Sequence, residues 1–192
     1  MSSRQAPLPS ISVDNVAVIR GNRLVLRGLT VTARSGDIIW VRGANGCGKS
    51  TLLRVIAGLL YATAGSIQTE GRIALADENL ALDANLTVEK ALMFWADMDG
   101  ASTDARGAAL ADMDLQGLAQ VPVRFLSTGQ RKRASIARVL ASKADIWLLD
   151  EPYNGLDSAS CARLDQAIRE AEAREANKRD EPDRLPPEQG GM

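Results

Sequence analysis

Apolar and polar residues alternate over most of residues 11–19, which is typical of a strand with one buried face. After a short turn, residues 24–32 return as a second strand, and the two together predict an antiparallel β-layer. The run at residues 37–42, Asp-Ile-Ile-Trp-Val-Arg, is almost continuously apolar and predicts a buried strand. Residues 51–57 then follow with helical spacing, so a short helix that stops at Gly58 is expected.

The rest of the pattern predicts further short strands and a helical half. One strand is expected after the turn at residues 63–66 and another at residues 71–76. Residues 86–117 are helical in pattern, with Thr87 as a candidate N-cap. A further helix is predicted to begin at a cap formed by Ser127 or Thr128 and to end at about residue 140. A buried strand over residues 143–149 and an amphipathic helix over residues 158–171 follow it.

The composition changes sharply at residue 172. From there to residue 192 the chain is charged, contains three prolines and has almost no large apolar side chain, which predicts a disordered tail. Residues 1–171 are then expected to form one domain, with a helical subdomain at about residues 80–140.

Charge and composition narrow the class of protein. The net charge of −1 gives no general attraction to nucleic acid. No apolar stretch approaches the roughly 20 residues of a membrane-spanning helix, and the first ten residues lack the apolar core of a signal peptide. Cys47 and Cys161 are the only cysteines and lack paired spacing, so neither a disulfide framework nor a zinc site is expected. A soluble protein of a reducing compartment is predicted.

Residues 43–51 carry the strongest chemical signal. They read Gly-Ala-Asn-Gly-Cys-Gly-Lys-Ser-Thr, a phosphate-binding loop whose glycines let backbone N–H groups wrap around a polyphosphate. An accidental glycine-rich turn is the alternative, and the strand and helix expected around the loop argue against it. The motif predicts that Lys49 reaches the β- and γ-phosphates and that the Ser50 hydroxyl ligates Mg²⁺. The expected nucleotide contacts are Gly43, Ala44, Asn45, Gly46, Cys47, Gly48, Lys49, Ser50 and Thr51.

Two carboxylates follow the second buried strand. Asp150 at its end is placed to hold Mg²⁺, directly or through water. Glu151 is placed to orient and polarise an attacking water. A solvated strand end would also explain an acidic pair, but the phosphate-binding loop makes a catalytic pair the favoured interpretation.

A weaker signal lies at residues 126–130, Leu-Ser-Thr-Gly-Gln. Ser127 and the N–H of Gly129, at the start of a helix, can form an anion site. A simple helix cap explains the same residues.

The order of these motifs resembles the nucleotide-binding domain of ABC transporters. Four motifs occur in the same order as in that family, and the resemblance covers roughly residues 10–170. They are the phosphate-binding loop, Leu126-Ser-Thr-Gly-Gln130, Asp150-Glu151-Pro152 and Asn154-Gly-Leu-Asp157. The resemblance implies an α/β P-loop core with a mainly parallel sheet, an antiparallel β-layer and a helical subdomain. It also implies ATP with Mg²⁺, ATPase activity, and a head-to-tail dimer in which Ser127, Gly129 and Gln130 bind the nucleotide held by the opposite subunit. Thr128 stands where glycine is more usual.

The resemblance also assigns an adenine contact. The position that matches the family's base-stacking aromatic is about Arg20, whose guanidinium can stack on a base. A solvated arginine in a turn is the alternative.

Several segments are similar to the ATP-binding subunit of the haem exporter of bacterial cytochrome c maturation. They include Leu86-Thr-Val-Glu89, the pair Phe94-Trp95, and Pro122-Val-Arg-Phe-Leu-Ser127. The resemblance implies integral membrane subunits that handle haem and its chaperone, and a peripheral position at the cytoplasmic face of the bacterial inner membrane. Phe94-Trp95 is either core packing of the helical subdomain or an exposed docking patch for a membrane subunit.

Two departures from the family pattern bear on catalysis. Glu78 stands where transporter domains usually have a Mg²⁺-sensing glutamine, and a glutamate there can still ligate Mg²⁺. The family's switch histidine and the core strand before it have no counterpart, since the sequence contains no histidine. The chain is therefore expected to be an ATPase subunit that lacks its last core strand. The alternatives are the ATP-binding subunit of another ABC exporter, a truncated chain, a fragment, or a non-hydrolytic subunit. A soluble ABC protein acting on ribosomes or DNA repair is disfavoured, because neither tandem domains nor a coiled-coil insertion is present.

Overall fold

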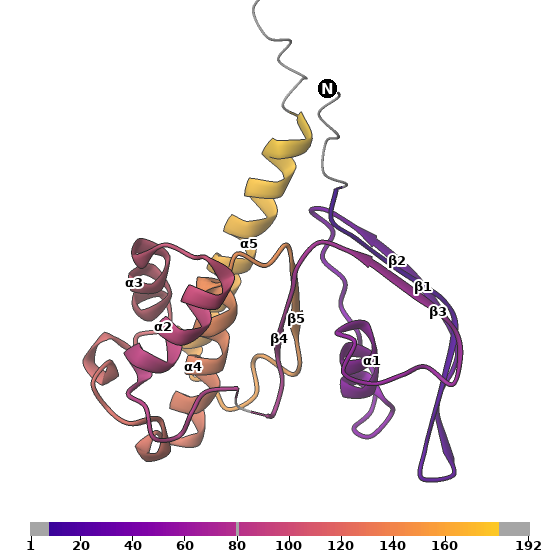
Figure 1. Cartoon of the computed structure of the whole chain (residues 1–192), viewed down its shortest axis with the longest axis horizontal. Helices are drawn as coiled ribbons and strands as arrows, with labels where there is room; N and C mark the ends of the chain where they lie inside the picture. The colour runs from indigo at the N-terminus through magenta and orange to yellow at the C-terminus, as the bar shows by residue number, and fades with distance from the viewer. Residues whose placement is uncertain (1–7, 80, 181–192) are drawn as a thin grey trace, which may run out of the picture.

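The computed structural model describes residues 8–79 and 81–180 (Figure 1). A layer of antiparallel strands lies on one side and a group of helices on the other, with a parallel strand pair between them (Figure 1). In the described part of the chain, no helix is long and apolar enough to cross a membrane.

The antiparallel layer contains β1 (Ser10–Arg20), β2 (Arg23–Arg34) and β3 (Ala64–Glu70), in the order β2-β1-β3. This confirms the β-layer predicted from alternation. Val13, Val16 and Val18 of β1 are buried, and the step of three between the first two marks a shift of register. The shift occurs at Asn15, whose φ of 47° lies in the left-handed region that an extra bulged residue often adopts.

The helix α1 (Lys49–Ile56) joins this layer to the parallel pair. Its Leu52, Val55 and Ile56 are buried in one cluster with the valines of β1 and with Ile146 and Leu148. The helix ends as predicted, with Ala57 as C-cap and Gly58 beyond it at a φ of 73°.

The helical subdomain contains α2 (Val88–Asp99), α3 (Thr103–Asp112) and α4 (Thr128–Ala141), with short 3₁₀ turns at Gln116–Leu118 and Val123–Phe125. Thr87 caps α2 by accepting a hydrogen bond from the N–H of Lys90, as the sequence predicted. Its core packs side chains from α2, α3, α4 and the later helix α5 (Ser158–Asp180), and from the chain between α3 and α4; they include Leu92, Met113, Leu115, Ile136 and Leu164.

The parallel pair is β4 (Ile73–Ala76) with β5 (Ile146–Leu149), and Ala76 lies opposite Leu149 in the register. The N–H of Asp150 donates to the carbonyl of Ala76 at 2.8 Å, so the ladder continues one residue past β5. Because parallel strands run in the same direction, the residues that follow β4 and β5 emerge at the same edge of the sheet.

The predicted strand at residues 37–42 is wrong. These residues form no strand, and Ile38, Ile39, Trp40 and Val41 are 41–58% exposed. A strand needs a neighbouring strand that satisfies its backbone hydrogen bonds. Among the described residues, no strand pairs with residues 37–42, and none pairs with β5 on the edge away from β4. The predicted parallel core therefore consists here of two strands.

The predicted tail is partly wrong as well. Helix α5 (Ser158–Asp180) continues past residue 171, so residues 172–180 are helical rather than disordered. The remainder of the predicted tail, residues 181–192, lies outside the described residues.

Candidate functional site

The phosphate-binding loop is an exposed turn between residues 43 and 48 that leads directly into α1. Lys49, the first residue of α1, folds back over the loop, and its Nζ donates to the carbonyls of Gly43 at 3.1 Å and Ala44 at 3.3 Å. Gly48 has a φ of 109°, and a Cβ there would lie 2.9 Å from side-chain atoms of Val25 and Leu26. A glycine is therefore required where β2 packs against the loop.

The loop lysine meets the glutamate that follows β5. Lys49 Nζ lies 3.6 Å from Glu151 Oε1, and the amide of Asn154 donates to the other carboxylate oxygen. Glu151 has a φ of 45°, which is uncommon for a residue other than glycine and is found in functional turns. Lys49 and Glu151, two site residues that the sequence predicted and that lie far apart along the chain, are thus in contact.

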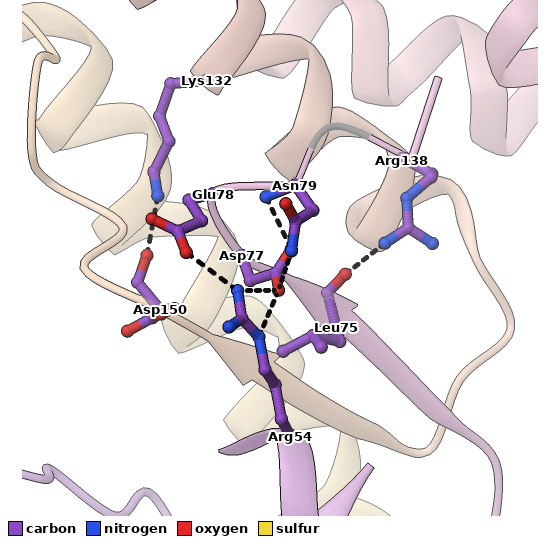
Figure 2. A network of polar contacts seen from close by, with 8 residues as sticks. All are labelled: Arg54, Leu75, Asp77, Glu78, Asn79, Lys132, Arg138 and Asp150. Carbon is purple, nitrogen blue, oxygen red and sulfur yellow. Dashed lines mark hydrogen bonds and ion pairs between the residues drawn. The ribbon is translucent and has the colours of Figure 1, made fainter. Parts of the chain in front are cut away.

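Asp150 is buried and its backbone is fixed from two directions. Only 7% of the Asp150 surface is exposed. Its N–H is bound by β4, and its carbonyl accepts a hydrogen bond from Lys132 Nζ of α4 at 2.6 Å (Figure 2). Burial lowers the pKa of Lys132, while the nearby carboxylates of Asp150 and Glu151 act in the opposite direction.

A cleft of about 320 Å³ opens over the phosphate-binding loop. Arg20 and Val25 of the β-layer line it on one side and Glu151 on the other. This volume is in the range of small-molecule sites. The structure therefore places Arg20, the residue expected at the base, at the same cleft as the phosphate-binding residues. The loop and α1 contribute Gly46, Gly48, Lys49, Ser50 and Thr51 to the lining.

The donor set suits Mg²⁺ held together with a nucleotide. The described residues contain no group of three or more histidine, cysteine, aspartate or glutamate side chains arranged to hold a metal. Mg²⁺ usually takes one or two protein oxygens and completes its shell with phosphate and water. The Ser50 hydroxyl and the Asp150 carboxylate are such oxygens; Ser50 lines the cleft, and Asp150 directly precedes the lining residue Glu151 without lining the cleft itself. The chemistry of these two residues fits the ion.

Glu78, the other predicted metal ligand, does not line this cleft. Its carboxylate lies 3.0 Å from Arg54 Nη2 on α1, and its side chain is 77% exposed. The same guanidinium binds the buried Asp77 (Figure 2).

The predicted anion site at the start of α4 forms a capping box. Ser127 Oγ accepts from the N–H of Gln130, and the Gln130 side chain accepts from the N–H of Ser127. These residues line a second hollow, of about 170 Å³, together with Gly129, Gly155 and Asp157. None of these residues lines the cleft at the phosphate-binding loop.

An aromatic contact connects the loop side to α5. Trp40 stacks on Tyr153 with ring centroids 5.9 Å apart, and the Tyr153 hydroxyl donates to Asp165. Burial and this hydrogen bond raise the pKa of Tyr153 to about 12. Sequence reasoning did not identify Tyr153, Arg54 or Lys132, because each acts through a partner that only the folded chain brings near.

The aromatic pair of α2 divides into one core residue and one surface residue. Trp95 packs against the core of the helical subdomain, donates to the carbonyl of Ala81, and lies under the Arg138 guanidinium at 4.9 Å. Phe94 is 55% exposed. Trp95 therefore fits the core-packing alternative, while Phe94 is exposed and its role as a docking residue stays a prediction.

Comparison with known proteins gives consistent matches. The family model for the ABC transporter matches residues 26–154, which contain the loop and both carboxylates. The cytochrome c biogenesis ATP-binding export protein CcmA of Sphingopyxis alaskensis is 53% identical over 158 residues, covering 82% of this chain and 81% of that protein. CcmA of Zymomonas mobilis is 51% identical, covering 82% and 71%. A solved structure of a putative ABC transporter ATP-binding protein from Pyrococcus furiosus matches with a TM-score of 0.74 and 25% identity, covering 86% of this chain and 87% of that one.

Proposed function

The chain belongs to the ABC transporter ATP-binding family, and we propose that it is the ATP-hydrolysing subunit of a bacterial export complex that serves cytochrome c biogenesis. The observation that carries the proposal is the 3.6 Å contact between Lys49 and Glu151 at the cleft over the loop. The assignment to cytochrome c biogenesis comes from the names of the relatives.

The residues of the cleft have separate roles in this proposal. The backbone N–H groups of the loop and Lys49 bind the phosphates of ATP. Ser50 and Asp150 hold Mg²⁺, which neutralises phosphate charge when bound. Glu151 accepts the hydrogen bond of the water that attacks the γ-phosphate, and its contact with Lys49 keeps it directed at the loop.

A second copy of the chain completes the site. Ser127, Gly129 and Gln130 line a hollow separate from the cleft at the loop. In a head-to-tail dimer, the start of α4 of one subunit faces the nucleotide of the other, where the helix N-terminus favours a phosphate. The capping box uses the Ser127 hydroxyl and the Gln130 side-chain oxygen as acceptors, so the Ser127 O–H and the Gln130 side-chain NH2 can donate to a phosphate while the box stays intact.

The membrane subunits dock on the helical subdomain. Met93, Phe94 and Met98 of α2 are large apolar residues that are 40–66% exposed, whereas Trp95 between them is engaged with the core. The proposed partners are integral, haem-handling subunits, and the chain works at the cytoplasmic face of the bacterial inner membrane. Affinity purification from gently solubilised membranes tests the partners, and Phe94→Ala should reduce the recovery of the membrane subunits while ATP binding is retained.

The Glu151→Gln variant tests hydrolysis. It keeps the size and the Asn154 contact but removes the charge that polarises water, so phosphate release should fall by about 100-fold or more. ATP binding should persist and an ATP-bound dimer should accumulate. Glu172→Gln on α5 is the matched control and should release phosphate at the wild-type rate. Equal phosphate release in Glu151→Gln would disprove the assigned role.

A non-hydrolytic subunit is the second candidate, and the absence of histidine from the sequence favours it. In that case the wild-type protein binds ATP and dimerises but releases no phosphate, with or without its membrane partners. The wild-type measurement therefore separates the two functions before any variant is made.

A further inference from the structure

Four acidic residues follow the two parallel strands at one edge. Asp77 and Glu78 come after β4, and Asp150 and Glu151 come after β5. Neighbouring strands lie about 4.8 Å apart, so side chains at this edge are within reach of one another. Asp150 and Glu151 are part of the proposed ATP site, which leaves the role of the β4 pair to be explained.

Arg54 binds both acidic residues after β4 (Figure 2). Its Nε lies 3.0 Å and its Nη2 2.9 Å from the same Asp77 oxygen, and Nη2 also lies 3.0 Å from Glu78 Oε1. The hydrogen bonds that Arg54 donates to Glu78 and Asp77 raise the pKa of Arg54. One guanidinium therefore contacts two consecutive carboxylates: Nη2 reaches both of them, and Nε adds a second contact with Asp77.

The two contacts differ in their surroundings. Asp77 is 8% exposed, and the backbone N–H of Asn79 also binds its carboxylate, so it is anchored inside the fold. Glu78 is 77% exposed, and Arg54 is its ion-pair partner. The Asp77 contact holds the turn in place, whereas the Glu78 contact can be exchanged for another ligand at low cost.

We propose that Arg54 is a positioning residue that keeps the Glu78 carboxylate on α1 and so withholds it from the Mg²⁺ of bound ATP. Glu78 then leaves the ion to Ser50, Asp150 and the phosphates, and its negative charge is paired with Arg54. The inference rests on the proposed ATP site, because it concerns the ion bound there.

The experiment measures how strongly Mg²⁺ improves nucleotide binding. Equilibrium dialysis of the full chain with a non-hydrolysable ATP analogue gives dissociation constants in Mg²⁺ and in EDTA, and their ratio is the Mg²⁺ gain. Arg54→Met should raise this gain about fivefold, because the released Glu78 contributes a ligand. A fivefold change corresponds to about 1 kcal/mol, the upper range for an exposed ion pair.

A second variant guards against loss of folding. Arg54→Met also removes the ion-pair partner of the buried Asp77, whereas Arg54→Lys keeps a cation there. Its ammonium lacks the planar fork and offers one nitrogen where Arg54 offers two, so it holds the exposed Glu78 less firmly. Arg54→Lys should therefore raise the Mg²⁺ gain in the same direction with a folded protein. The double variant Arg54→Met/Glu78→Gln should return to the wild-type gain.

Arg163→Met is the matched control, because Arg163 pairs at 3.9 Å with the exposed Asp114 instead of with residues of the β4 turn. It should show the wild-type gain. Gains within twofold of wild type for both Arg54 variants would overturn the proposal. A fivefold loss of gain in Glu78→Gln alone would also overturn it, since Glu78 would then already reach the ion. Failure of the wild-type chain to bind the analogue would instead disprove the ATP site itself.

Discussion

The candidate site has two sides that are built differently: the carboxylates that follow β4 and β5, and the loop that precedes α1. On the carboxylate side, Asp150 is buried, bonded to β4 through its N–H and to Lys132 through its carbonyl. On the loop side, residues 37–47 are almost all exposed, and Lys49 binds carbonyls of its own loop. The acidic turns are therefore held in place before any nucleotide binds, whereas the loop is exposed and its contacts are local, such as the hydrogen bond from the N–H of Cys47 to the carbonyl of Ala44.

Because of this difference, substitutions on the two sides should affect different properties, the stability of the fold on one side and nucleotide binding on the other. Groups on the carboxylate side are fixed by contacts with other elements, so their loss should reduce the stability of the whole chain. The exposed loop side has few such contacts, so its changes should affect nucleotide binding more than folding. Three substitutions test this division, from the largest expected effect on stability to the smallest.

The Asp77→Ala variant tests the fixed side. It leaves Arg54 with Glu78 alone and removes the acceptor of the Asn79 N–H, so the free energy of unfolding should fall by about 2–3 kcal/mol. Urea denaturation followed by circular dichroism measures this. Asp114→Asn is the control: the carboxylate is 62% exposed and 3.3 Å from Arg133, and asparagine tolerates the φ of 52° at this position, so loss of the charge should cost at most about 1 kcal/mol. Equal costs for the two variants would show that the β4 turn is not anchored by its ion pair.

The Gly48→Ala variant tests the loop at its tightest point. An added Cβ meets Val25 and Leu26 at 2.9 Å with a φ of 109°, so the loop must shift, at a cost of about 1–2 kcal/mol. Displacing the loop N–H groups should also weaken ATP binding about tenfold or more. Gly58→Ala, with a φ of 73° and nothing within 4 Å, should cost up to about 1 kcal/mol and leave ATP binding unchanged. Unaltered ATP binding in Gly48→Ala would mean that the loop adapts freely.

Local features of this fold could be predicted because they depend on neighbouring residues. Thr87 caps α2, α1 stops before Gly58, and β1 and β2 pair as their alternation indicated. The loop and the Asp150-Glu151 pair were also recognisable, since each motif is short and its spacing is fixed by the phosphate chemistry.

Features that depend on distant neighbours could not be predicted. Arg54 and Asp77 are charged residues whose pairing requires α1 to lie against the end of β4. The apolar run at residues 37–42 fits a buried strand equally well on sequence grounds, because apolarity indicates what a segment could bury and not which strand pairs with it. Tyr153 was missed for the same reason, since Trp40 and Asp165 come from opposite sides of its position in the sequence.

The Ile39→Thr variant is expected to have the smallest effect and tests the exposed side directly. Ile39 is 47% exposed in a segment without a strand partner among the described residues, so a polar replacement should change the free energy of unfolding by less than about 0.5 kcal/mol. Ile136→Thr is the matched control, because Ile136 is fully buried in the helical core and the same change should cost about 2–3 kcal/mol there. Thermal and urea unfolding measure both. If Ile39→Thr lowered the free energy of unfolding nearly as much as Ile136→Thr, residues 37–42 would be covered in the working protein. The contrast between the two sides of the site would then hold only for the isolated chain.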